Sequence, residues 1–337
     1  MNPIQKIDQL AGEFTARPAL TNVYGLARTV LALGPFLTLL ANDATVLFPE
    51  SAVATKTATS SLVEISLFNL LAGHLWLAKG IALLILGLVI IGWRPRFTGV
   101  LHWYVAFSFF SACSVIDGGD HVSSIMALWF VPLTLLDNRK WHWQSADYLQ
   151  PMGKGKEAML MAAWAVILLI RIQVAVIYLH AGEAKLQVDE WANGTAVYYW
   201  FTHHYHGAAS WLKPLVQWAL SHKIVVMAVT WGTMIFELVL FAALFMNPNS
   251  RRRKALLVLG IAFHFGIVLI HGLISFFCSM ACCLIIYLRP ADKPFNFGWV
   301  VALKTKLLGR GLQFRQGQAA GQPNHSAQVL QANATEQ

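Results

Sequence analysis

Long apolar stretches recur along the whole chain, and the short polar connections between them carry most of its basic residues. An apolar run of about 18 residues or more with few charges is long enough to cross the hydrocarbon core of a bilayer as a helix. Hydrophobic residues make up 57% of the 337 positions and charged residues only 12%. The sequence therefore predicts an all-α protein, a polytopic transmembrane helical bundle.

The apolar pattern predicts about eight spans of roughly 20 residues each. A re-entrant or interfacial segment is expected near 183–222, because its apolar pieces are too short to cross the bilayer. The predicted spans cover residues 23–41, 64–93 and 98–116, a short stretch ending at 136, then 158–181 and 224–246, and two minimal crossings within 255–290.

Four parts of the chain follow from this count. Residues 1–22 are a cytoplasmic N-terminal segment without a cleavable signal, and 23–290 form the transmembrane domain. Residues 291–315 are predicted to be a basic amphipathic helix on the membrane surface. The polar residues 316–337 are expected to be a disordered tail.

The basic residues indicate an orientation. The clusters at 93–96, 139–156 and 251–254 and the basic tail fall on one side of the membrane if there are eight spans. Both termini are then cytoplasmic. The formal net charge of +9 is explained by these membrane flanks, so the lipid bilayer is the expected partner and nucleic acid is not. Arg28, about one turn inside the first span, is expected to snorkel to the boundary, and His102 is interpreted as an interface residue.

The stretch 171–207 is where an apolar segment carries His180, Glu183 and Lys185 as it leaves the membrane. Ionisable residues are costly in a span and are usually there for function. On a helix, Tyr178 and Lys185 share one face. Burial would favour the neutral amine of Lys185, which could then act as a base; the alternative is an ordinary interfacial lysine.

Two further charged residues lie within predicted spans. Arg171 and Glu237 have similar inferred depths in successive spans, so we expect a structural ion pair between them. The histidines at 180, 203, 204 and 206 raise the alternative of a metal site, because imidazole is the commonest metal ligand. They lack HExxH spacing, so no metal site is predicted.

Several segments resemble one known family. They are TNVYGLART (21–29), DGGDH (117–121), LTLLDNRKWHW (133–143), IYLHAGEAKLQVDEWANGTAVYYWFTHH (177–204), FHFGIVLIHGLISFF (263–277) and IIYLRP (285–290). Together they are similar to the SdpB (sporulation-delaying protein B) family of bacterial membrane proteins, over about residues 20–290. That family belongs with the HTTM domain, the membrane region shared with vitamin K-dependent gamma-glutamyl carboxylase.

The resemblance implies a set of site residues. AGEAKL (181–186) followed by Trp191 and Gly194 matches the carboxylase motif that carries the catalytic lysine, which places Lys185 at that position. His121 and His264 fall where the carboxylase has active-site histidines. The expected catalytic residues are thus Lys185, His121 and His264. The substrate- or cofactor-binding residues are expected to be Tyr178, His180, Glu183, Trp191, Gly194, Tyr198, His203, His204, Asp117 and Asp120.

The resemblance also implies a function. Proteins of the SdpB type act with an SdpA-like partner in maturing an exported peptide toxin from an SdpC-like precursor at the bacterial cytoplasmic (inner) membrane. Carboxylase-like chemistry, with a lysine base at the outer face, would use a reduced quinone such as menaquinol or vitamin K hydroquinone. Two alternatives stay open: a non-catalytic assembly or export factor that holds the precursor, and a membrane metal-dependent oxygenase built on the histidines.

Overall fold

The computed structural model describes residues 17–144 and 155–296. This described part is helical, and its extended pairing is limited to one isolated antiparallel bridge between Trp93 and Trp141. The predicted all-α class is therefore confirmed. The tail at 316–337 lies outside the described residues, as do most of the N-terminal segment and of the surface helix predicted at 291–315.

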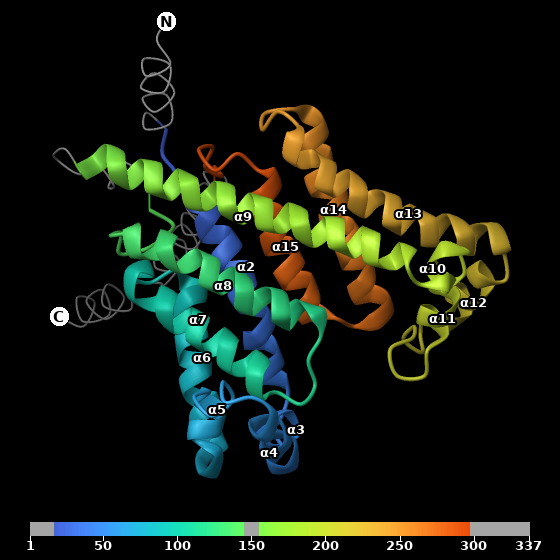
Figure 1. Cartoon of the computed structure of the whole chain (residues 1–337), viewed down its shortest axis with the longest axis horizontal. Coiled ribbons are helices and arrows are strands. Elements are labelled where there is room, and N and C mark those ends of the chain that lie inside the picture. The colour runs from blue at the N-terminus through green and yellow to red at the C-terminus, as the bar shows by residue number, and fades with distance from the viewer. Residues whose placement is uncertain (1–16, 145–154, 297–337) are drawn as a thin grey trace, which may run out of the picture. The chain divides into compact units, whose positions relative to one another are not determined.

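Eight helices of the described part have 15 residues or more (Figure 1). They are α2 (Asn22–Ala41), α6 (Leu75–Ile91), α7 (Pro95–Ala112), α8 (Gly118–Leu136), α9 (Gly155–Leu186), α13 (Lys223–Ala242), α14 (Arg251–His271) and α15 (Ile274–Leu288). Six of the eight, all except α7 and α15, belong to segments long and apolar enough to cross a membrane, and α15 is a shorter apolar helix. The chain is a multi-pass membrane protein, and the count of eight spans remains a prediction.

Shorter helices fill the connections between the long ones. On the N-terminal side these are α3 (Ala44–Leu47), α4 (Glu50–Thr59), α5 (Leu67–Leu70) and η1 (Ala72–His74), and after α9 they are α10 (Asp189–Ala192), α11 (Ala196–Thr202) and α12 (Lys213–Leu220), with η3 (Ala243–Phe245) after α13. The helices α10 to α12 have 4, 7 and 8 residues, too few to cross a bilayer. A re-entrant or interfacial position for this segment stays a prediction.

The second predicted span, 64–93, begins too early. Its first part forms α5 and η1, and the long helix starts only at Leu75. The Ser66 side chain accepts a hydrogen bond from the backbone of Asn69 and so starts a separate short helix. The predicted span is divided because this local capping interrupts an apolar pattern that otherwise continues.

Close helix pairs organise the bundle. The pairs α2 with α15, α7 with α8, and α9 with α13 lie side by side (Figure 1). Small residues allow the close approach, as is common between membrane helices. A Cβ atom at Gly182 of α9 would lie 2.9 Å from the Leu238 side chain of α13, and one at Gly260 of α14 would lie 2.9 Å from Leu284 of α15.

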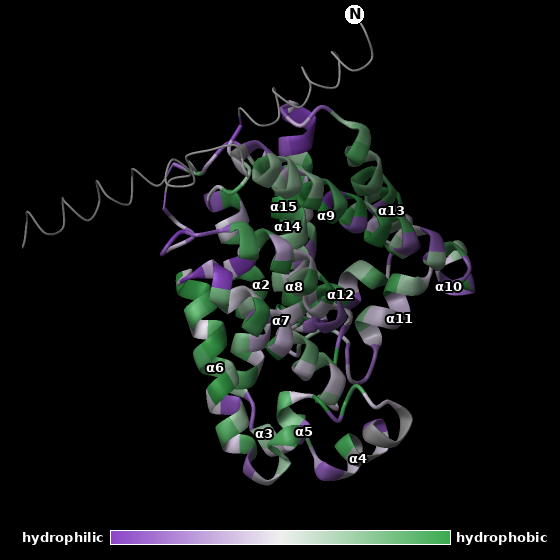
Figure 2. Ribbon diagram, turned by 60° about the vertical axis from the view of Figure 1, so that its left-hand side comes forward, coloured by the Kyte–Doolittle hydropathy of each residue, from purple (hydrophilic) through white to green (hydrophobic). Residues whose placement is uncertain are grey.

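Polar connections gather at the ends of the apolar helices, whereas the residues along α6 and α13 are largely hydrophobic (Figure 2). The backbone N–H of Arg94 donates to the carbonyl of Lys140 at 2.8 Å, and that of His142 donates to Gly92 at 3.0 Å. The basic clusters at 93–96 and 139–144 therefore lie at the same end, as the charge pattern predicts.

Candidate functional site

Lys185 lies in the last turn of α9, and its amine donates hydrogen bonds to three acceptor atoms. Nζ donates to Oε1 and Oε2 of Glu237 on α13, at 2.9 and 2.8 Å, and to the carbonyl of Ala181 at 2.9 Å. The two side chains are 22% and 9% exposed. This is one of two ion pairs between side chains of the described residues, and it joins two long helices.

Trp191 covers the amine from the segment that follows α9. Nζ of Lys185 lies 5.3 Å from the centre of the Trp191 ring, within the range of a cation–π interaction. Gly194, three residues later, has a positive φ of 83°, and a Cβ there would lie 3.2 Å from Met227 and Trp231. Glycine therefore permits the turn that sends the chain back along α13.

A second polar pair lies on the same helices. The hydroxyl of Tyr178 and Nε2 of His264 on α14 are 3.1 Å apart, and the two side chains are 1% and 2% exposed. Nδ1 of His264 has no partner among the described residues. The rings of Phe263 and Phe276 pack edge-on against the imidazole at 5.0 and 5.5 Å.

The two pairs form one constellation, which we call the Lys185 site: Lys185, Glu237, Trp191, Tyr178 and His264. The Lys185 ammonium is near enough to His264 to interact with it electrostatically, and Glu237 is similarly near Tyr178. The site thus combines an amine, a carboxylate, a phenol and an imidazole at the junction of α9, α13 and α14. These groups are able to accept, hold and pass a proton.

Asp117 and Asp120 do not reach the Lys185 site; they cap α8. Asp117 accepts from the backbone of Gly119 and Asp120, and Asp120 accepts in return from the backbone of Asp117, in a capping box. The hydroxyl of Ser275 on α15 also donates to Asp117 at 2.6 Å. The next residue, Phe276, packs on His264, so one aromatic layer lies between this cap and the site.

His121, predicted to be catalytic, also lies away from Lys185. Its side chain is exposed, and its ring stacks on Phe110 of α7 at 4.8 Å. The DGGDH turn therefore places its carboxylates toward α15 and its histidine toward α7. A role for His121 stays a prediction, and it would act on a different face of α8.

Five predicted binding residues are exposed and are not joined to the Lys185 amine by any contact in the described part of the chain. His203 ends α11, and its Nδ1 accepts from the backbone of Tyr205 and His206, so this imidazole supports a local turn. The five are His180, Glu183, Tyr198, His203 and His204. In the described residues, no group of three or more His, Cys, Asp or Glu side chains could hold a metal ion.

The predicted pair between Arg171 and Glu237 is wrong. Arg171 donates instead to the carbonyls of Ile286 and Arg289, at 3.2 and 3.1 Å, where α15 ends. Arg171 precedes Lys185 by 14 residues, which is about 21 Å along a helix. Glu237 lies level with Lys185, because the first half of α13 packs on the returning segment: Val197 donates to the Thr230 hydroxyl and Trp231 to the carbonyl of Ala192.

Sequence reasoning missed the true partner of Lys185, although the signal was present. Glu237 is the one acidic residue in its predicted span, and Lys185 is the nearest basic residue on the α9 face that carries Gly182. Gly182 contacts Leu238, the neighbour of Glu237. Since glycines mark the closest approach of membrane helices, Gly182 could have set the register between the two helices.

A multi-pass helical membrane protein with an ion-paired lysine at a helix junction is the class that this fold and site define. The chain belongs to the HTTM domain family, which matches residues 56–291. It is 38% identical to the uncharacterised Bacillus subtilis protein YitO over 301 residues, 88% of this chain and 94% of that protein. It is 34% identical to the sporulation-delaying protein SdpB of Bacillus subtilis over 300 residues, 87% of this chain and 89% of SdpB. The chain is therefore a membrane protein of the SdpB type. No solved structure matches it.

Proposed function

We propose that this protein matures an exported peptide toxin at the bacterial cytoplasmic membrane, with both termini in the cytoplasm. It acts there with an SdpA-like partner on an SdpC-like precursor peptide. The similarity to sporulation-delaying protein SdpB supports a role in the maturation of such a peptide. The observation that carries the chemistry is the Lys185 amine, held by Glu237 and covered by Trp191 between membrane helices.

Lys185 acts as the general base in this proposal. An ammonium cannot accept a proton, so it first passes one to Glu237, whose Oε2 lies 2.8 Å from Nζ. The products are a neutral amine and a neutral carboxylic acid, which a site of low polarity tolerates better than separated charges. The amine then takes a proton from an acidic group of the bound peptide and becomes an ammonium again.

Tyr178 and His264 form the second half of the site. Their hydrogen bond holds the imidazole between two phenylalanine rings, and the unpartnered Nδ1 leaves one ring nitrogen for a substrate. This arrangement supports a role for His264 in orienting a reactant or passing a proton. The role predicted for His121 would concern a part of the peptide that lies against α7 and α8.

A reduced quinone as co-substrate stays a prediction. An apolar pocket of about 230 Å³ lies between α11, α12, α13 and the end of α14, lined by residues such as Val197, Val226 and Ile270. Lys185, Tyr178 and His264 are not among its lining residues. No step in the proposal uses a quinone.

The test is the mass of the exported peptide. Cells that produce precursor, partner and this protein are compared with cells that carry Lys185→Met or Lys185→Arg. Lys213→Met is the matched control, because Lys213 is an exposed lysine of the same segment. We expect mature peptide with the wild type and the control and unmodified precursor with both Lys185 variants. Mature peptide from a folded Lys185→Met protein would rule out the base.

A non-catalytic factor that holds the precursor is the second candidate. The observation in its favour is that His180, Glu183, Tyr198, His203 and His204 are exposed and separate from Lys185, as expected of a polar surface for a peptide. In that case the Lys185→Met protein supports maturation, whereas replacing several of these exposed residues abolishes crosslinking to the precursor. A metal-dependent oxygenase would contain two metal ions per chain, and elemental analysis of the purified protein would detect them.

A further inference from the structure

A second buried polar group lies apart from the Lys185 site, where the 137–144 segment meets α2 and α7. We call it the Arg28 cluster. Its members come from three parts of the chain and are buried: Tyr24 and Arg28 of α2, Thr98 and His102 of α7, and Asp137, Arg139 and His142 of the connecting segment. The expectation that Arg28 snorkels to the boundary is wrong, because its side chain is 0% exposed. His102, at 1%, is likewise not an interface residue.

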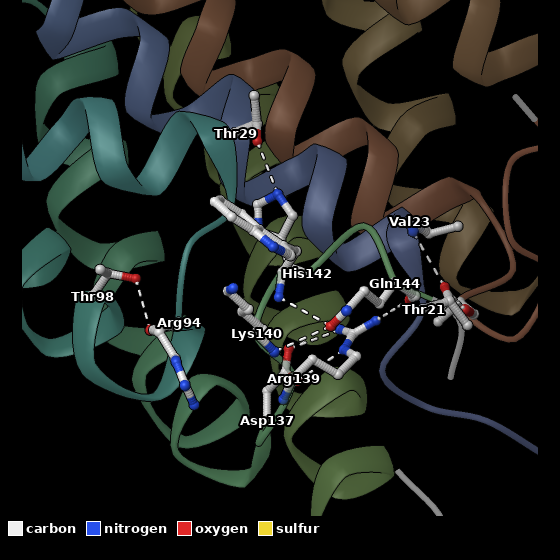
Figure 3. Close-up of polar contacts among 12 residues, drawn as sticks. Thr21, Val23, Thr29, Arg94, Thr98, Asp137, Arg139, Lys140, His142 and Gln144 are labelled. Carbon is white, nitrogen blue, oxygen red and sulfur yellow. Dashed lines mark hydrogen bonds and ion pairs between the residues drawn. The ribbon is translucent and has the colours of Figure 1, made fainter. Parts of the chain in front are cut away.

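The charges of the cluster do not balance. Asp137 accepts from Arg139 through both carboxylate oxygens, at 2.8 and 2.7 Å, and both side chains are fully buried (Figure 3). This bidentate pair neutralises Arg139. Asp137 lies within electrostatic reach of Arg28, but the single carboxylate cannot compensate two guanidinium groups. One net positive charge remains inside the protein.

Arg28 has one hydrogen bond in the described part of the chain. Its Nη2 donates to the Thr98 hydroxyl at 2.7 Å, and that hydroxyl donates onward to the carbonyl of Trp93 at 2.8 Å. Nε and Nη1 of Arg28 have no partner among the described residues. A buried guanidinium keeps its charge, so leaving these donors unpaired is strongly unfavourable.

Two neighbouring groups also lack a hydrogen-bond partner. Tyr24 lies one helical turn before Arg28, and His102 one turn after Thr98, so each shares the face of its helix that carries the cluster. The Tyr24 hydroxyl and Nε2 of His102 are buried without a partner among the described residues. Both side chains interact electrostatically with Arg28. Unpartnered donors around an uncompensated cation are the environment that binds an oxyanion.

The 137–144 segment closes this end of the cluster. The ring of His142 contacts α2 and the turn before α7: a Cβ at Gly25 would lie 2.9 Å from the ring, and one at Gly92 would overlap it. The imidazole shares a hydrogen bond with the Thr29 hydroxyl, 3.3 Å from Nε2 (Figure 3). This segment covers the cluster, so an anion bound there would have to be small or a terminal group.

We propose that the Arg28 cluster binds an oxyanion of the phosphate class, with Nε and Nη1 of Arg28 and the hydroxyl of Tyr24 as its donors. Inorganic phosphate and the phosphate group of a lipid offer the same chemistry. The site does not depend on the function of Lys185. It makes an anion a structural component of the bundle at the end where the basic connections gather.

Phosphate titration of the full-length protein in uncharged detergent tests the proposal. Phosphate replaces chloride at constant ionic strength, and the melting temperature is recorded. We expect a saturable rise in Tm for the wild type, because a ligand that binds only the folded state stabilises it. Arg28→Gln should lose this rise. Arg96→Gln should keep it, since Arg96 is an exposed neighbour whose Nη1 donates to Asn138.

Tyr24→Phe provides a second variant that keeps the volume and packing of the ring. It should raise the phosphate concentration needed for half of the effect by about tenfold, as expected for one lost hydrogen bond to a charged group. If Arg28→Gln does not fold, this variant decides the test. A saturable rise in Tm with the same half-maximal phosphate concentration in the wild type and in Tyr24→Phe would overturn the proposal.

Phosphorus analysis distinguishes the two sources. The purified wild type should contain one more phosphorus atom per chain than Arg28→Gln or, if that variant does not fold, Tyr24→Phe. An excess that leaves with an organic-solvent extract identifies a lipid phosphate, whereas an excess that dialyses away identifies the free anion. A saturated wild type shows the excess without a Tm response, which supports the proposal. A wild type with neither a saturable Tm rise nor an excess of phosphorus refutes it.

Discussion

Replacing Glu237 by glutamine should destabilise the protein by about 3 kcal/mol. The two charges are 2.8 Å apart and attract each other by about 6 kcal/mol at an effective dielectric constant of about 20. Desolvation of both groups offsets part of this attraction. Removing one partner of a buried pair costs about 3–5 kcal/mol, because the other charge is left without compensation. Since the Lys185 side chain is 22% exposed and can regain some water, we expect the lower end of that range.

A double-mutant cycle measures the interaction itself. Glu237→Gln, Lys185→Met and the double variant are unfolded by titration with sodium dodecyl sulfate in mixed micelles, and helix content is followed by circular dichroism. The double variant should be more stable than Glu237→Gln, because it contains no unpaired charge. Glu183→Gln is the control. Glu183 is an exposed carboxylate of α9, the helix that carries Lys185, so its replacement should change the stability by less than about 0.5 kcal/mol.

The size of the coupling energy decides whether this reasoning holds. A coupling of about 2 kcal/mol or more between positions 185 and 237 agrees with a pair held between the helices. A coupling below about 0.5 kcal/mol would show that the two groups act as independent solvated charges. The proton transfer from Lys185 to Glu237 would then lose its basis as well.

Three further predictions concern single residues. Burial, with the charges of Arg28 and Arg139, lowers the pKa of His142 from 6.5 to about 2; the unfolded chain therefore binds a proton that the folded protein does not, and stability should fall by about 2 kcal/mol between neutral pH and pH 5. His142→Asn should flatten this pH profile, and an unchanged slope would contradict the assignment. Gly194→Ala should destabilise the protein by about 1–2 kcal/mol in the detergent titration and shift the Trp fluorescence, because φ is 83° there; an effect within error would show that the turn tolerates a side chain. Tyr178→Phe should cost about 1–2 kcal/mol in the same titration through the lost hydrogen bond to His264, and a neutral result would mean that the pair is not formed in the membrane protein.

The helical class could be predicted from the sequence because backbone groups in lipid must be paired within each segment, and long apolar runs satisfy this as helices. The location of the candidate site followed from a similar argument, since the cost of charge in lipid singles out Lys185. The prediction for His264 came from the resemblance to the membrane region of the carboxylase, and the structure places this residue beside Tyr178.

Partners across helices could not be predicted, because they depend on register. The ion pair between Glu237 and Arg171 was predicted from their similar positions along successive spans, which assumes that α9 and α13 begin and end at the same level in the membrane. In the structure, α9 is one helix of 32 residues whose C-terminal end meets the second half of α13. The burial of Arg28 was missed for a related reason: snorkelling assumes an accessible boundary, and the 137–144 segment, distant in sequence, closes it.

The unbroken course of α9 ties two distant anchors to each other. Arg171 is fixed to the C-terminal end of α15 and Lys185 to Glu237, so the number of residues between them sets both the spacing and the angle of the two side chains. Inserting a single residue between them would turn the amine by about 100° around the helix axis and move it by about 1.5 Å. The helix could then satisfy only one of its two anchors, so this interval of the sequence should tolerate substitutions far better than changes of length.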